Sequence, residues 1–178
     1  MIKSHNIPSP IMTPVTLLKV INFIIFQCIW FACVLGGNEY LALSIALIAL
    51  HFTLSSTRKK DLQVMVVITL IGGACDLTLR LTGVLVFDTT LIPLWLVVLW
   101  SGFSLTLTHS LEWLSRSPRT LQSGLGAIGG AASYFAGYTF EAVSFSYNIL
   151  PTLSIVFVLW GSLIPTFYLL VNRYAYAE

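Results

Sequence analysis

The chain has few charged residues, and no stretch of it matches a known catalytic motif. Only 9% of its 178 residues are Asp, Glu, Lys or Arg, whereas about 25% is usual for a soluble domain. Hydrophobic residues make up 57%, and the mean hydropathy is +0.88. This composition excludes an ordinary soluble domain, and the small net charge of +2 gives no footprint for a nucleic-acid partner. We therefore expect a membrane protein, surrounded by membrane lipids, whose site is built from its spans.

Cysteine is also scarce. Cys28, Cys33 and Cys75 all lie inside apolar segments, at spacings that indicate neither a metal site nor a disulfide framework. We expect them to be small buried hydrophobic residues. The sequence identifies no cofactor.

Six apolar segments predict an all-α fold, a polytopic membrane bundle of six transmembrane helices. About 20 apolar residues are needed to cross a bilayer, and the chain is long enough for six such crossings with short loops. Residues 1–14 are predicted to be a cytosolic lead-in, residues 15–173 the transmembrane domain and residues 174–178 a cytosolic tail. The predicted spans are about 15–35, 40–56, 62–81, 93–114, 121–143 and 151–171.

The basic residues predict how this bundle is oriented. Of nine Lys and Arg residues, eight fall on one side of the predicted spans, and Arg80 is the exception. Loops rich in Lys and Arg stay in the cytoplasm. The pattern therefore puts both termini, the loop at Arg58–Lys60 and the loop at Arg116 on the cytoplasmic side.

Several polar side chains fall at a similar depth inside the predicted spans. His51 and His109 each lie seven residues before an arginine of a cytosolic loop, which puts both about 10 Å below the cytosolic edge. Gln27 lies about 12 Å deep by the same estimate, and Asn22 and Glu112 lie nearer the surface. Because polar groups are costly inside a bilayer, their default interpretation is functional. We expect a polar pocket that opens to the cytosol.

Three interpretations of this pocket stay open. In the first, His109 and Glu112, spaced i and i+3, act as general acid and base on a lipid-borne substrate. His51 is then a third catalytic residue, and Gln27 and Asn22 bind the substrate. A metal site of two histidines and one carboxylate is the second, indicated only weakly because the ligands come from separate helices. In the third, the histidines only hold neighbouring helices together and Glu112 reaches the inner headgroups.

A second pair of charged residues lies deeper in the third span. Asp76 is fifteen residues past Asp61, or about 22 Å along a helix, and Arg80 follows one turn later. The pair is expected to form a salt bridge along one helix face. The alternative is a binding role, in which Asp76 is a proton or cation relay below an outer vestibule that also contains Glu141.

Small residues repeat along the fifth span. Gly126 and Gly130 form a GxxxG pair, which is typical of close helix packing in lipid. Such a helix is expected either at the centre of the bundle or at a contact with a partner, which would be a second copy of the chain or a membrane enzyme.

A family resemblance extends over most of the chain. It is carried by Asn22-Phe23, Phe26-Gln27, Trp30-Phe31, His51-Phe52, Asp76, Pro93-x-Trp95-Leu96, Leu99-Trp100, His109-Ser110-Leu111-x-Trp113-Leu114, and Gly126-Ala127-x-Gly129-Gly130 followed by Tyr134-x-Ala136-Gly137. On these residues the chain resembles a family of small bacterial inner-membrane proteins that is defined only as a domain of unknown function. The resemblance implies a multi-pass protein of the bacterial inner membrane.

The same resemblance implies a role with lipids, because the family resembles gene neighbours of cyclopropane-type fatty-acid modification enzymes. It transfers no catalytic residues, since none are established in the family. It would also imply a proline after Gly129-Gly130, and this chain departs from that pattern with Ala131.

The class of function stays open, including whether the chain is an enzyme. The first hypothesis is a protein that binds or modifies lipid acyl chains through the pocket of His109, Glu112 and His51. The second is a small transporter or proton-coupled carrier that uses Asp76 and Glu141. The third is a scaffold without catalytic activity that recruits a lipid-modifying enzyme through its GxxxG helix.

Overall fold

The computed structural model describes residues 14–175, and most of them are helical. The predicted lead-in and tail therefore lie almost entirely outside the described residues. Two short 3-10 helices, η1 and η2, and two short strands connect the α-helices. The elements in chain order are α1 (Pro14–Gly36), η1 (Gly37–Tyr40), α2 (Leu41–Leu54), α3 (Arg58–Leu81), β1 (Leu85–Val86), α4 (Leu94–Leu107), η2 (Glu112–Arg116), α5 (Arg119–Thr139), β2 (Ser144–Phe145) and α6 (Ile149–Ala175).

Three helical stretches are long and apolar enough to cross a membrane. They are Val15–Leu54, in which α1, η1 and α2 follow each other directly, together with Arg58–Leu81 and Ile149–Arg173. Large apolar side chains on the outside of the bundle are strongly exposed, such as Leu150 at 78% and Val158 at 68%. Such a surface suits lipid rather than water, which agrees with the composition.

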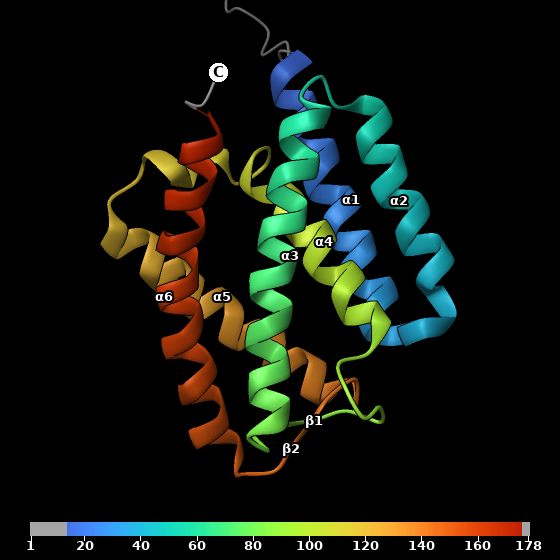
Figure 1. Cartoon of the computed structure of the whole chain (residues 1–178), viewed down its shortest axis with the longest axis vertical. Coiled ribbons are helices and arrows are strands. Elements are labelled where there is room, and N and C mark those ends of the chain that lie inside the picture. Colours follow the sequence, from blue (N-terminus) through green and yellow to red (C-terminus); the bar gives the residue numbers. More distant parts are fainter. Residues whose placement is uncertain (1–13, 176–178) are drawn as a thin grey trace, which may run out of the picture.

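The helices form two groups. In the first, α1 packs against α2 and α4, and α3 packs against α4. In the second, α5 and α6 form a tightly packed hairpin, which meets the first group mainly where α6 contacts α3. Figure 1 shows that α1 begins and α6 ends at the same end of the bundle.

Two contacts that are distant in the sequence link these groups: a short strand ladder and a side-chain hydrogen bond. At one end, β1 and β2 form an antiparallel ladder that pairs Leu85 with Phe145 and joins the loop after α3 to the loop before α6. Near the middle, the Trp30 indole of α1 donates a hydrogen bond of 2.9 Å to the Ser133 hydroxyl of α5. The ladder was not predicted, because two-residue strands carry no periodic pattern.

Glycine allows the closest helix contacts. A Cβ atom at Gly130 of α5 would lie 2.1 Å from Cγ of Trp160, and one at Gly126 would lie 2.5 Å from Ile164. Trp160 and Ile164 both belong to α6. The GxxxG face of α5 is therefore covered by α6 of the same chain. Likewise, a Cβ at Gly72 would lie 2.3 Å from the ring of Trp100. These glycines fix the positions of two tryptophans.

The fourth span was predicted to extend too far toward the C-terminus, and its predicted end is wrong. Instead of reaching residue 114, α4 stops at Leu107, and residues 108–111 form turns before η2. The Leu111 amide returns to the Thr106 carbonyl at 2.8 Å, which closes the turn. The Thr106 hydroxyl bonds to the Phe103 carbonyl at 2.6 Å, a local contact that competes with the helical pattern. In α5, by contrast, the helix continues through Ala131, the position at which the resemblance led us to expect a proline.

Candidate functional site

Asp61 is the centre of the polar cluster, although its sequence position suggested a charged loop. It lies in the first turn of α3, where the helix N-terminus favours a negative charge. Its side chain is completely buried. Hydroxyl groups surround the carboxylate: Ser55 donates to Oδ2, Thr57 donates to the same atom at 3.3 Å, and Thr108 donates to Oδ1 at 3.1 Å.

His109 approaches the same carboxylate from the turn that follows α4. Its Nε2 atom lies 3.1 Å from both oxygens of Asp61. Because a carboxylate accepts hydrogen bonds, Nε2 carries the proton that it donates. The side chain of His109 is 19% exposed, whereas Asp61 is fully covered. The carboxylate therefore sets the orientation of an imidazole that remains accessible.

Asn22 determines which nitrogen of His51 carries the proton. The Asn22 carbonyl accepts the Ser110 amide at 3.2 Å, and the Asn22 Nδ2 group donates to the Leu105 carbonyl at 3.3 Å. These backbone partners fix the orientation of the amide. Its Nδ2 group also lies 3.2 Å from Nδ1 of His51, so that Nδ1 is an acceptor.

The proton of a neutral His51 ring is therefore on Nε2. This atom lies 3.5 Å from Oδ2 of Asp61 and makes no hydrogen bond to any residue that the structure describes. The rings of His51 and His109 are close, with centroids 4.7 Å apart and planes at 79°. Three of the predicted pocket residues, namely His51, His109 and Asn22, are thus brought together.

The spacing of this cluster alone would suit a metal ion. His51, Asp61 and His109 each offer a ligand atom, and these atoms lie within 4.8 Å of one another. A metal needs the lone pair of each ring nitrogen, however, and metal-bound histidines donate their other N–H to an acceptor. The Asn22 amide presents a donor to Nδ1 of His51, which keeps the proton on Nε2. The hydrogen bonds thus favour a carboxylate held by proton donors over a metal centre.

A polar cavity of about 300 Å³ lies next to this cluster. His51, His109, Asn22 and the hydroxyl residues line it, as do Lys19, Lys60 and Glu112, whereas Asp61 does not. The Lys19 ammonium lies 2.9 Å from Glu112, and Arg116 lies 3.5 Å from the same carboxylate. The hydrogen bond from Lys19 holds the pKa of Glu112 below its ordinary value.

Glu112 is thus at the cavity but is not the carboxylate that pairs with His109. The predicted i, i+3 arrangement needs a continuous α-helix, and the chain leaves the helix at Leu107. Gln27 lies one and a half turns beyond Asn22 on α1 and is partly buried. It is not among the residues that line either cavity.

Asp76 and Arg80 are also placed differently from the prediction. Asp76 is fully buried, and it accepts a hydrogen bond of 2.6 Å from the Trp100 indole and one from the Tyr134 hydroxyl. Arg80 donates to the Thr89 carbonyl at 3.4 Å. Within residues 14–175 the two do not form a salt bridge, because side chains from α4 and α5 supply the donors that Asp76 needs. Glu141 is exposed in the turn after α5.

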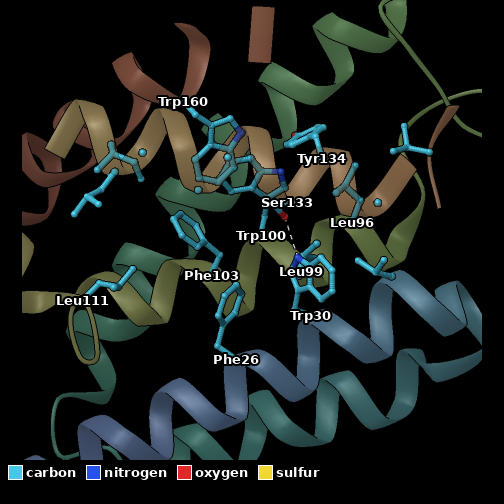
Figure 2. A pocket seen from close by; sticks show the side chains of 18 of the residues that line it. Phe26, Trp30, Leu96, Leu99, Trp100, Phe103, Leu111, Ser133, Tyr134 and Trp160 are labelled. Carbon is cyan, nitrogen blue, oxygen red and sulfur yellow. Dashed lines mark hydrogen bonds between the residues drawn. The ribbon is translucent and has the colours of Figure 1, made fainter. Parts of the chain in front are cut away.

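A second cavity, with aromatic walls, was not predicted from the sequence. It has a volume of about 400 Å³, and most of its lining residues belong to α1, α4, α5 and α6. All five tryptophans of the chain line it. Figure 2 shows Phe26 and Trp30 of α1 pointing toward Trp100 and Phe103 of α4, with Trp160 of α6 beyond them. The sequence feature that could have indicated this cavity is the presence of two tryptophans, Trp30 and Trp100, inside predicted spans.

The segment from Leu111 to Leu114 separates the two cavities. Glu112 lines the polar cavity, whereas Leu111, Trp113 and Leu114 line the aromatic cavity. The Tyr168 hydroxyl bonds to the Leu111 carbonyl at 2.8 Å, and the Gln122 amide bonds to the Leu114 carbonyl at 2.9 Å. Both ends of this segment are therefore fixed to the α5–α6 hairpin.

Comparison with known proteins gives a family but no characterised relative. Residues 19–166 match the model of a family described as protein of unknown function (DUF2878). The match includes the cluster around Asp61 and all five tryptophans. No curated protein and no solved structure matches the chain.

Proposed function

The chain belongs to the DUF2878 family of proteins of unknown function, and from its geometry we propose that it binds an acyl chain of a membrane lipid in the aromatic cavity. The observation that carries this proposal is that all five tryptophans surround one cavity. Aromatic side chains bury much apolar area and rarely surround unfilled space in a protein interior, which is normally close-packed.

The lining of the cavity suits a hydrocarbon chain. Aromatic and aliphatic side chains dominate its walls, and Gly129 of α5, where a Cβ would meet no atom within 4 Å, leaves space beside them. From Leu125 to Gly137 the lining follows α5 for about 18 Å. The cavity is therefore elongated along the helix, as an acyl chain requires, and its volume is in the usual range for ligand sites.

The cavity can also be reached from the lipid. Trp113 is 53% exposed and Leu125 is 40% exposed, and both line the cavity. They mark an opening on the outer surface of the bundle, between η2 and α5. An acyl chain would enter sideways from the bilayer, where such chains are the surrounding solvent.

The orientation of the protein follows from its charges. Arg58, Lys59 and Lys60 begin α3, and Arg116 ends η2, near the polar cavity. The positive-inside rule puts this end in the cytoplasm. Six crossings with both termini inside, in a bacterial inner membrane, complete the proposal. The polar cavity then opens at the level of the inner-leaflet headgroups.

Two other classes of function have less support. A transporter needs a polar path, whereas the cavity that lies beside Trp100 and Tyr134, the partners of Asp76, has aromatic and aliphatic walls. A scaffold that uses the GxxxG face would need that face to be free, and α6 covers it.

Tryptophan fluorescence with brominated lipids tests the proposal. Bromine atoms on an acyl chain quench a tryptophan that they contact, and here every tryptophan lies at the cavity. We expect saturable quenching of the purified protein in detergent when a brominated phospholipid is added. Quenching that only rises in proportion to the lipid fraction would count against a specific site.

A matched pair of variants locates the site. A Cβ at Gly129 meets no atom within 4 Å, so the leucine of Gly129→Leu has space next to the cavity that this residue lines. Gly124 is equally open but does not line the cavity, which makes Gly124→Leu the control. We expect Gly129→Leu to abolish the saturable component and Gly124→Leu to keep it. Equal quenching in both variants would place the bound chain elsewhere.

A further inference from the structure

The polar cavity is a second site that acyl-chain binding does not use. It lies on the other side of the Leu111–Leu114 segment, and no residue lines both cavities among those that the structure describes. Two ammonium groups, of Lys19 and Lys60, line it beside the single carboxylate of Glu112. Its charge balance therefore favours an anionic ligand.

One wall of this cavity faces lipid. Val15 and Leu18 of α1 line it, and these side chains are 62% and 43% exposed on the outside of the bundle. The opposite wall consists of hydroxyl groups and imidazole rings, such as Thr108 and His109. A site with one apolar and one polar wall at the end of a membrane helix suits the headgroup region of a lipid better than a freely soluble molecule.

Asp61 has a positioning role at this site. It does not line the cavity, and its own hydrogen-bond donors seal it from solvent. Among residues 14–175, the only hydrogen bonds of the His109 ring are those from Nε2 to Asp61. Nδ1 is therefore the nitrogen of His109 that remains available as a proton acceptor. In His51 the same atom is occupied by Asn22.

We propose that the polar cavity binds the headgroup of an anionic lipid that carries a hydroxyl group, and that Nδ1 of His109 accepts a hydrogen bond from that hydroxyl. Lys19 and Lys60 attract the phosphate as point charges. The Asp61 carboxylate accepts the Nε2 proton of His109 at 3.1 Å and so keeps Nδ1 free of a proton. No covalent bond of the lipid is broken in this contact.

Chemical modification of histidine tests this proposal directly. Diethyl pyrocarbonate acylates an accessible ring nitrogen that carries no proton, and peptide mass spectrometry locates the product. We expect His109 to react severalfold faster than His51, whose Nδ1 is occupied and whose residue is only 4% exposed. Equal rates at the two rings would overturn the assignment of His109.

Protection by lipid identifies the ligand. Phosphatidylglycerol added to the detergent-solubilised protein should slow the modification of His109 severalfold, and phosphatidylcholine should not. Protection by both lipids, or by neither, would overturn the headgroup proposal. Protection by soluble glycerol phosphate as strong as that by phosphatidylglycerol would overturn the lipid part of it.

Neighbouring lysines supply the control. Lys60 lines the cavity, whereas Lys59 is exposed and does not. Lys60→Gln should weaken protection by phosphatidylglycerol, and Lys59→Gln should leave it unchanged. Equal effects would show general attraction to the membrane instead of a site.

Nitrogen-15 NMR of the histidine rings tests the role of Asp61, because His109 should carry its proton on Nε2. A proton on Nδ1 would contradict this role, whatever the result for acyl-chain binding.

Discussion

Nε2 of His109 lies 3.1 Å from both carboxylate oxygens of Asp61, although 48 residues separate the two in the sequence. The contact joins the start of α3 to the turn after α4. It brings a buried charge and an accessible imidazole together beside a polar cavity. From the cluster around Asp61 and the helices around the aromatic cavity we predict effects on stability, helix packing and metal binding.

Asp61 should be important for stability as well as for the orientation of His109. In Asp61→Asn one carboxylate oxygen becomes an amide NH2 group, so the donors that face this oxygen lose their acceptor and the negative charge is lost. Removing one partner of a buried charged network typically costs about 3 kcal/mol or more. We expect a clearly lower midpoint of thermal unfolding in detergent, whereas Asp88→Asn, at an exposed acidic residue, should leave it unchanged. Equal midpoints for the two variants would mean that the network adds little.

Glycines of α5 should differ sharply in their tolerance of a methyl group. Gly130→Ala places a Cβ against Trp160, and overpacking of this kind costs about 1–3 kcal/mol. Gly124→Ala adds the same group in open space, where alanine favours the helix by about 1 kcal/mol. Thermal unfolding should therefore shift down for the first variant and slightly up for the second. A stable Gly130→Ala variant would show that the α5–α6 contact is looser than described.

Asn22 should control whether the cluster can bind a metal. In the native chain the Asn22 amide keeps the proton of His51 on Nε2. In Asn22→Asp an acceptor replaces this donor, so the proton moves to Nδ1 and the Nε2 lone pair turns toward Asp61, as in metal sites. After incubation with zinc and gel filtration, elemental analysis should find little zinc on the native protein and more on Asn22→Asp. Stoichiometric zinc on the native protein would contradict the proton assignment.

Glu112 should contribute to stability at neutral pH and lose this contribution in acid. Lys19 lowers its pKa in the folded protein, so the stabilisation is present above the ordinary pKa of 4.5 and is lost as the pH falls through the folded value. Because both side chains are 39% exposed, the contribution should stay below about 1 kcal/mol. We expect Glu112→Gln to lower the unfolding midpoint slightly at pH 7 and not in acid. A difference in unfolding midpoint between the native protein and Glu112→Gln that grows in acid would contradict the lowered pKa of Glu112.

The sequence predicted the part of the site that depends on depth. Asn22 lies in α1, His51 near the end of α2 and His109 in the turn after α4, and a fixed rise per residue from the basic loops puts all three at one level. It missed Asp61 because the third helix was predicted to begin at residue 62, whereas α3 begins at Arg58 and includes Asp61 in its first turn. A charged side chain at a helix start can face the core, and local composition does not reveal this.

Features that depend on which helices are neighbours could not be predicted. The expected pairing of Asp76 with Arg80 considered one helix alone, and the structure supplies Trp100 and Tyr134 from two others. The aromatic cavity is a space between the two helix groups, so no single segment carries its pattern. The helices themselves were largely predicted because apolar length is a local property. Their packing was not.

A map of the protein in a lipid nanodisc, by electron cryomicroscopy, is the most direct test of acyl-chain binding. The account predicts elongated density between Trp100 and Gly129 that continues along α5 toward the opening at Trp113. Protein side chains that close this space, or a cavity without elongated density in a map that resolves the tryptophan rings, would contradict it.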